Sequence, residues 1–232
     1  PLRILALLLA AFLAAPAWAQ QVFEGPLRIG IVIPTAPANS PLKAAVARSA
    51  RDGAVIAEEE FQFNAELVGI DFALLKAEAS GAREVVAAAE KLVKDGAYAV
   101  MGGFTTEEAA ALGAWAAPRS IPFLNIGAQA DSLRNESCMP TMFHIEPSAA
   151  MYIDAFIGWY VRSGFRRWYI VQQDNDEGKS QYQRTRWSMQ ERFFGAREVG
   201  HTVLKPGASG GAALATAIRR SGADMVMLLQ SA

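Results

Sequence analysis

The hydrophobic positions of this chain alternate between two kinds of segment over most of its length. Short runs rich in apolar and β-branched residues, such as 27–33 (LRIGIVI) and 97–103 (AYAVMGG), predict buried strands. Longer segments carry apolar residues at helical spacing. In 81–96 (GAREVVAAAEKLVKDG) the larger apolar side chains fall on one side, and Gly96 is a natural helix stop.

The order of these segments predicts a parallel sheet covered by helices on both faces, because strands and helices follow one another in strict alternation. Up to residue 127 we expect strands at 27–33, 66–77, 97–103 and 121–127, with helices at 44–61, at 81–96 and after residue 105. The same alternation resumes later, with helices at 149–163, 178–194 and 212–222 and strands at 166–173, 197–204 and 223–229.

A polar stretch at 127–147 interrupts the alternation and carries prolines at 140 and 147. It predicts a long loop and a crossover strand (TMFHI), with a hinge near 140–147. The expected fold class is therefore α/β, with two doubly wound parallel-sheet lobes at 20–142 and 143–232. The second unit has only three predicted strands and the sequence stops just past an apolar one, so we expect its sheet to be incomplete and the chain to be truncated.

Residues 1–19 differ in character from the rest of the chain. Arg3 is the only charge before residue 20, an apolar run covers 4–15, and Ala17-Trp18-Ala19 ends in a small-x-small pattern. These features predict a secretory signal peptide at 1–19 and a periplasmic mature protein. The alternative is an uncleaved membrane anchor, although the run is shorter than the roughly 20 residues that a spanning helix needs.

Composition and motifs exclude several classes of protein. The 232 residues carry a net charge of −1 without a basic block, which disfavours nucleic-acid binding. Cys138 is the only cysteine, so it forms no internal disulfide, and its loop suggests no catalytic role. His144 and His201 lie far apart, so we expect no metal and no cofactor. No G-x-S-x-G, dinucleotide-binding or P-loop motif occurs, so an exported enzyme is a minor alternative.

The segment 101–118 (MGGFTTEEAAALGAWAAP) allows two interpretations. Thr105-x-x-Glu108 matches a capping box, in which each side chain bonds the other residue's backbone N–H. Alternatively, ligands of open α/β sheets bind beyond strand ends at helix N-termini, where glycines, hydroxyls and free N–H groups can hold a carboxylate. The two interpretations compete, because a donor used by the cap is not free for a ligand.

Several segments, in this order, resemble the periplasmic substrate-binding proteins of branched-chain amino-acid-type ABC transporters. They are RIGIVIPTAP, RDGAVIAEEEF, EVVAAAEKLVKDGAYAVMGGFTTEEAAALGAWAAPRSIPFLNIGA, MFHIEPS and RRWYIVQQDNDEGKS. The resemblance, to the leucine/isoleucine/valine-binding group of the type I periplasmic-binding fold, extends from about residue 27 to the end. It implies a two-lobed, non-enzymatic protein that closes on a small ligand.

The resemblance also implies a set of ligand-binding positions. The family presents Ser or Thr after the third strand, which corresponds to Thr106 with Thr105 beside it. The loop after the fourth strand corresponds to Gly127 and Gln129, and the loop after the first strand begins at Thr35. A position that is commonly aromatic in the second lobe is Glu177 here.

Acidic residues at or beside the expected binding positions depart from the family pattern and predict a different class of ligand. Glu107 and Glu108 flank the expected carboxylate site and disfavour an anion there, whereas Asp174, Asp176 and Glu177 are able to meet a cation. The alternative for the last three is a solvated loop and helix N-terminus, where acids are favoured anyway. We hypothesise a ligand other than a plain aliphatic amino acid.

We therefore interpret the chain as a monomeric, exported solute-binding protein that delivers a small polar or amino-acid-like ligand to an ABC transporter permease. The alternative is the ligand-sensing domain of a receptor or regulatory system. The tryptophans are expected to be core or surface-covering residues rather than ligand-stacking ones, and the helix face shared by Tyr152 and Trp159 is expected to pack on a sheet.

Overall fold

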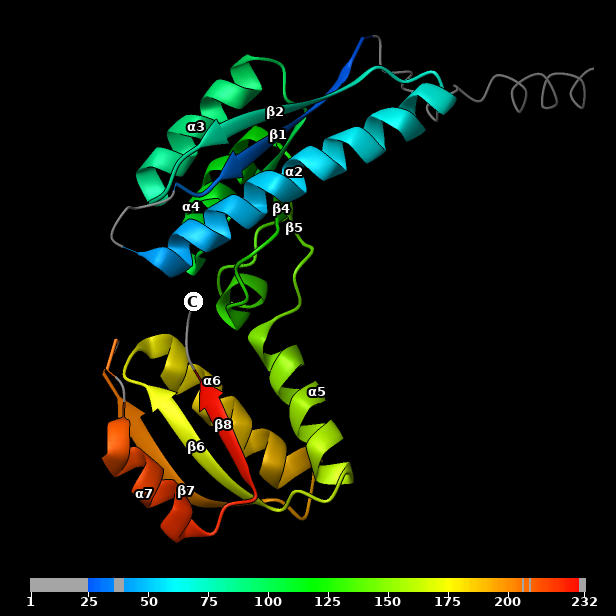
Figure 1. The fold of residues 1–232 in the computed structure, drawn as a ribbon. Helices are drawn as coiled ribbons and strands as arrows, with labels where there is room; N and C mark the ends of the chain where they lie inside the picture. The colour runs from blue at the N-terminus through cyan, green and yellow to red at the C-terminus, as the bar shows by residue number, and fades with distance from the viewer. Residues whose placement is uncertain (1–24, 36–39, 206, 209, 230–232) are drawn as a thin grey trace, which may run out of the picture.

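The computed structural model describes residues 25–35, 40–205, 207–208 and 210–229. The predicted signal peptide at 1–19 lies outside these residues, as does part of the loop that follows Thr35. The described residues form two α/β lobes, each built around its own parallel sheet (Figure 1). This arrangement confirms the predicted fold class. None of the helices in the described part of the chain is long and apolar enough to cross a membrane.

The first lobe contains a five-stranded sheet with the order β2-β1-β3-β4-β5, in which all neighbouring strands are parallel. Its central strands are short and apolar, and the side chains of Val32, Ile33, Val100 and Phe123 are almost completely buried. The strands are β1 (Leu27–Ile33), β2 (Phe72–Glu78), β3 (Ala99–Gly102), β4 (Phe123–Asn125) and β5 (Met142–His144).

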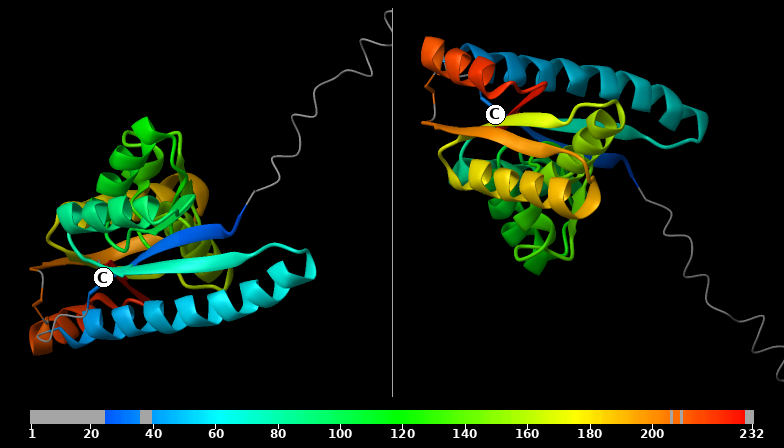
Figure 2. Two further views of the ribbon diagram at one scale, coloured as in Figure 1. Left: turned by 90° about the horizontal axis from the view of Figure 1, so that it is seen from above. Right: turned by 90° about the horizontal axis from the view of Figure 1, so that it is seen from below.

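Helices cover both faces of this sheet, as Figure 2 shows from above. The long helix α2 (Pro41–Leu67) packs on one face through small residues such as Ala50 and Ala54. Helices α3 (Ala82–Lys94) and α4 (Thr106–Ala116) pack on the other face around the larger of the lobe's two apolar clusters. The start of α2 was predicted closely, but the helix runs to Leu67, where we expected a strand from residue 66.

The change from one sheet to the other occurs immediately after His144. Strand β5 pairs in parallel with β4, through Phe123↔Met142 to Asn125↔His144, so it belongs to the first sheet. The expected lobe boundary at 142/143 falls inside this strand, and the linker between the lobes is residues 145–148. Ser148 then caps the helix that opens the second lobe, by accepting a hydrogen bond from the backbone N–H of Met151.

The second lobe contains a three-stranded parallel sheet with the order β7-β6-β8. The central strand is the most apolar, and Trp168, Ile170 and Val171 on it are fully buried. Its elements are α5 (Ala149–Arg162), β6 (Arg167–Gln173), α6 (Asp176–Trp187), a π-helical turn (Ser188–Arg192), β7 (Arg197–Leu204), α7 (Gly211–Ser221) and β8 (Met225–Leu229).

Helix α5 turns an aliphatic face towards the second sheet, and two of its aromatic residues, Tyr152 and Trp159, lie outside this face. Ile153, Ile157 and Val161 are buried in the cluster that also contains Trp168. Tyr152 and Trp159 are 47% and 65% exposed, so the expectation that their shared face packs on the sheet was wrong. Helix α7 lies on the opposite side of this sheet from α5 and α6 (Figure 2).

Candidate functional site

The N-terminus of α4 is closed by the capping box that the sequence predicted. The hydroxyl of Thr105 accepts from the backbone N–H of Glu108, and the Glu108 carboxylate accepts from the N–H of Thr105. The other carboxylate oxygen of Glu108 accepts from the N–H of Gly81 at 2.9 Å, which ties α4 to the start of α3. Glu108 is therefore a buried structural residue, and its place on an acidic rim was predicted wrongly.

Thr35 and Thr105 lie around one hollow at the strand ends of the first lobe. Thr35 donates its hydroxyl and its backbone N–H to the hydroxyl of Ser80, at 3.0 and 2.9 Å. A cavity of about 390 Å³ next to them is lined also by Lys43 and by the exposed Glu107. This cavity brings together the loops that follow β1, β2 and β3.

Asn125 organises the loop that follows β4. Its side chain is fully buried, and its Oδ1 accepts from the N–H groups of Gly127 and Ala128, at 3.3 and 2.9 Å. Its Nδ2 donates to the Ala128 carbonyl at 2.8 Å and to Nδ1 of His144 at 3.0 Å. A Cβ on Gly127 would lie 3.0 Å from the Cα of Phe104, so glycine allows the two loops to approach closely.

Gln129 is bound to the linker between the lobes. Its Nε2 donates to Oε1 of Glu146 at 2.9 Å, and the same oxygen accepts from the phenol of Tyr152 at 2.7 Å. The Glu146 carboxylate thereby raises the pKa of Tyr152. Arg134 also donates to the Glu146 backbone carbonyl. One carboxylate of the linker thus joins a loop of the first lobe to α5 of the second.

His144, next to this linker, has its pKa lowered by desolvation and by the positive charge of Arg134, against an opposing backbone interaction with Leu133. A depressed pKa in the folded protein means that the unfolded chain binds a proton first as pH falls. The stabilising contribution of His144 is therefore complete above about 6.5 and is lost as pH falls through the lower pKa of the folded protein.

We expect the free energy of unfolding to fall as pH is lowered from about 6.5, with a slope from this residue of at most ~1.4 kcal/mol per pH unit. Urea unfolding of the wild type and of His144→Gln at several pH values measures the difference between their slopes. Identical slopes in the two proteins would contradict this assignment.

Thr106 and Glu177 face the same cavity from opposite lobes. This cavity of about 350 Å³ lies between the first turns of α4 and α6 and is lined also by Asp131, Ser132 and Ser180. It adjoins a second cavity, of about 420 Å³ and lined by Gln129, because Ala149 and Gln181 line both. Two positions that sequence placed on different lobes are thus brought together at one site.

The electrostatics of Glu177 differ from those of its acidic neighbours. Glu177 is half-buried, and desolvation raises its pKa although it lies in the first turn of α6, where the helix dipole favours a negative charge. Asp176 is fully exposed and pairs with Lys179 at 3.5 Å. Asp174 is exposed as well. Among the described residues, the Glu177 carboxylate has no hydrogen-bond or ion-pair partner.

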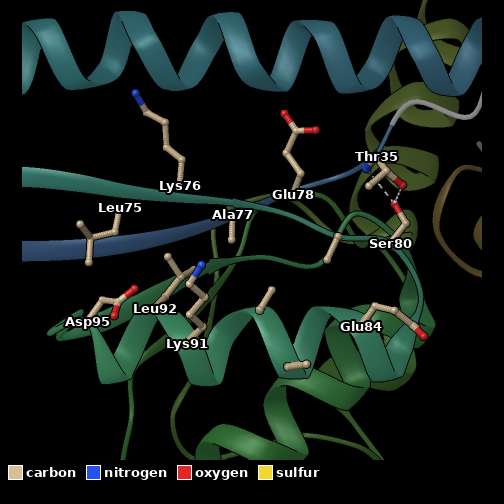
Figure 3. Close-up of a pocket in the computed structure, with 13 residues that line it drawn as sticks. Thr35, Leu75, Lys76, Ala77, Glu78, Ser80, Glu84, Lys91, Leu92 and Asp95 are labelled. Carbon is tan, nitrogen blue, oxygen red and sulfur yellow. Dashed lines mark hydrogen bonds between the residues drawn. The ribbon is translucent and has the colours of Figure 1, made fainter.

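A larger cavity, of about 730 Å³, lies outside the region between the lobes, along the free edge of β2 beside α3 (Figure 3). Lys76 and Glu78 point away from it towards α2, where they pair with Glu58 and Arg51. It is an open groove that contains Thr35 at one end and none of the other predicted ligand-binding residues. Size alone therefore does not identify the site.

The structure divides the predicted binding residues into three groups. Thr106 and Glu177 share the cavity between the lobes, and Thr35 and Thr105 line a hollow of the first lobe. Gly127 and Gln129 lie in the loop after β4, where the first is bound to Asn125 and the second to Glu146. The sequence interpretation missed several residues that line or shape these cavities, namely Lys43, Ser80, Asn125, Asp131, Ser132, Glu146, Tyr152 and Ser180. A buried strand that ends in Asn was the available signal for Asn125.

No group of three or more His, Cys, Asp or Glu side chains able to hold a metal ion occurs in the described part of the chain. Cys138 is a free, exposed thiol.

Comparisons with known proteins agree on the fold. The sequence model of a family described as periplasmic binding protein matches residues 26–232. A search of curated protein sequences gives no match. Many solved structures are similar to this chain. One of them is a branched-chain amino acid ABC transporter periplasmic ligand-binding protein from Burkholderia xenovorans (TM-score 0.73, 15% identity, 86% of this chain and 52% of that chain).

Two further similar structures contain ligands. One is an ABC transporter solute-binding protein from R. palustris in complex with benzoate (TM-score 0.65, 17% identity, 89% of this chain and 56% of that chain). The other is an ABC transporter substrate-binding protein from Desulfitobacterium hafniense in complex with Leu (TM-score 0.69, 14% identity, 89% of this chain and 59% of that chain). The present chain therefore spans little more than half the length of these proteins.

Proposed function

Because this chain belongs to the periplasmic binding protein family, we propose that the full-length protein is the solute-binding component of an ABC transporter. It captures a small polar or amino-acid-like ligand between its lobes and delivers the ligand to a membrane permease. The observation that carries this proposal is the cavity that Thr106 and Glu177 share from opposite lobes. Its volume is in the range that small ligands occupy.

Ligand capture in this arrangement is a population shift rather than a chemical reaction. A ligand that touches α4 and α6 at the same time stabilises the conformation in which the two lobes are close, and its affinity reflects that difference in contact. The linker at 145–148 provides the point about which the lobes rotate. Under this proposal Thr106 contributes a hydroxyl from the first lobe, and Thr35, Thr105 and Gly127 shape the neighbouring loops.

The ligand is proposed to differ from a plain aliphatic amino acid. The residues that line the cavity are hydroxyl, amide and carboxylate side chains together with two alanines, so no aromatic or branched aliphatic side chain of the described residues is present there to pack against an aliphatic ligand. We further propose that the protein is exported by the signal peptide at 1–19, acts in the periplasm as a monomer, and requires no cofactor.

The proposal is tested on the full-length mature protein. Native mass spectrometry of the purified protein is expected to show a monomer with one small molecule bound, and removal of that molecule is expected to expand the protein in small-angle X-ray scattering. Re-addition should restore the compact form. A protein that binds no small molecule, or that converts the bound molecule into a product, would refute solute capture.

A further inference from the structure

Glu177 is distinct among the acids of the second lobe because it is half-buried, faces a cavity and has no partner among the described residues. We propose that Glu177 is a specificity-determining residue, which selects ligands that carry an organic cation, an ammonium or a guanidinium group, at the end facing α6. This inference rests on the proposed solute-binding function and names the class of solute.

The first argument concerns the cost of the unpaired carboxylate. A partly desolvated carboxylate is unfavourable unless hydrogen bonds or an opposite charge compensate it. The exposed Asp176 obtains this compensation from solvent and Lys179, whereas Glu177 obtains no such ion pair. A cationic ligand supplies the missing partner, and it binds more tightly because its contact relieves this cost.

The second argument concerns the charge of the whole cavity. Its lining contains three carboxylates, from Asp131, Asp176 and Glu177, and no Lys, Arg or His. A ligand with an anionic end here meets repulsion without compensation. The hydroxyls of Ser132 and Ser180 are able to accept hydrogen bonds from the N–H groups of an ammonium or guanidinium.

The third argument separates an organic cation from a metal ion. The described residues contain no group of three or more side chains that could hold a metal, so the acids of this cavity do not converge on one point. Spread carboxylates suit a ligand with several donors at a distance from one another. Thr106, opposite Glu177 at the first position of α4, offers a hydroxyl to the other end of such a ligand.

The test uses calorimetry on the full-length mature protein with arginine and citrulline, which have nearly the same shape but differ in the charge of the terminal group. Leucine and glutamate complete the set of probes. Arginine is expected to bind about 10- to 100-fold more tightly than citrulline, the range that a hydrogen bond to a charged group provides. Glutamate is expected to bind more weakly than citrulline.

Glu177→Gln is expected to remove the preference of the protein for arginine over citrulline. Asp174→Asn is the matched control, because Asp174 is a nearby exposed acid that does not line the cavity, and it should keep the preference. The ligand-free Glu177→Gln protein should be at least as stable as the wild type, because the substitution removes a desolvated charge. A purely structural role for Glu177 would instead lower stability.

The possible outcomes distinguish this inference from the function on which it rests. Equal binding of arginine and citrulline, or a preference that persists in Glu177→Gln, would overturn the role of Glu177 while solute capture stands. Tight binding of leucine that is unaffected by Glu177→Gln would do the same. A protein that binds none of the four probes and contains no co-purified small molecule would overturn both.

Discussion

Trp168→Ala is expected to lower the free energy of unfolding of the second lobe by about 3–5 kcal/mol, the usual cost of removing a fully buried aromatic side chain. Trp168 is completely buried near the start of β6, where it belongs to the apolar cluster formed by α5 and the sheet, and its indole N–H donates to the Phe165 carbonyl at 3.2 Å. The substitution leaves a large cavity beside a sheet that has three strands in the described part of the lobe.

Urea unfolding of the full-length protein, followed by far-UV circular dichroism, measures this loss, with each transition analysed separately because two lobes need not unfold together. Trp159→Ala is the matched control. Its side chain is 65% exposed on α5, so the expected change is within about 0.5 kcal/mol. A loss below ~1 kcal/mol for Trp168→Ala would show that the core of this lobe is arranged differently.

Asn125→Ala is expected to destabilise the first lobe by at least about 2 kcal/mol, because it leaves two backbone groups without their hydrogen-bond partner and each costs ~1–3 kcal/mol. The N–H of Gly127 loses its acceptor and the Ala128 carbonyl loses its donor, whereas the N–H of Ala128 keeps a second acceptor, the Gly103 carbonyl, at 2.8 Å. Ligand affinity should fall as well, since the loop that holds Gln129 loses its shape.

Asn125→Asp separates the two halves of this network. A carboxylate still accepts from both N–H groups, but it cannot donate to Ala128 or to His144 and it places a charge at a fully buried position, so the expected loss is at least as large as for alanine. Asn135→Ala serves as the control, because Asn135 is exposed and bonds only a nearby carbonyl. Urea unfolding and calorimetry are performed on all three variants, and an alanine variant as stable as the control would rule out this role of Asn125.

Local signals in the sequence were sufficient to predict the sheets and most of the helices. The strand at 27–33 and the capping box of Thr105 and Glu108 depend on residues within a few positions of one another, and both were confirmed. The end of α2 was missed because Val68 and Ile70 continue an apolar pattern past Leu67, although their side chains are largely exposed.

The site was harder to predict because it depends on contacts between distant residues. No residue close to Gln129 in the sequence indicates that its amide donates a hydrogen bond to Glu146, 17 positions later. Likewise, Asp174, Asp176 and Glu177 are equivalent acids in the sequence, and only the position of α6 opposite α4 separates the half-buried one from its solvated neighbours. The exposed face of Tyr152 was missed because Tyr152 bonds Glu146 rather than packing on the sheet.

The shared carboxylate of Glu146 has a consequence for the motion between the lobes. Its Oε1 accepts from Gln129 of one lobe and from Tyr152 of the other, so a rotation about residues 145–148 that separates these two donors would lengthen at least one of the bonds. Under the proposed function, Glu146 is therefore expected to favour the arrangement of the lobes described here over arrangements in which the two donors lie further apart.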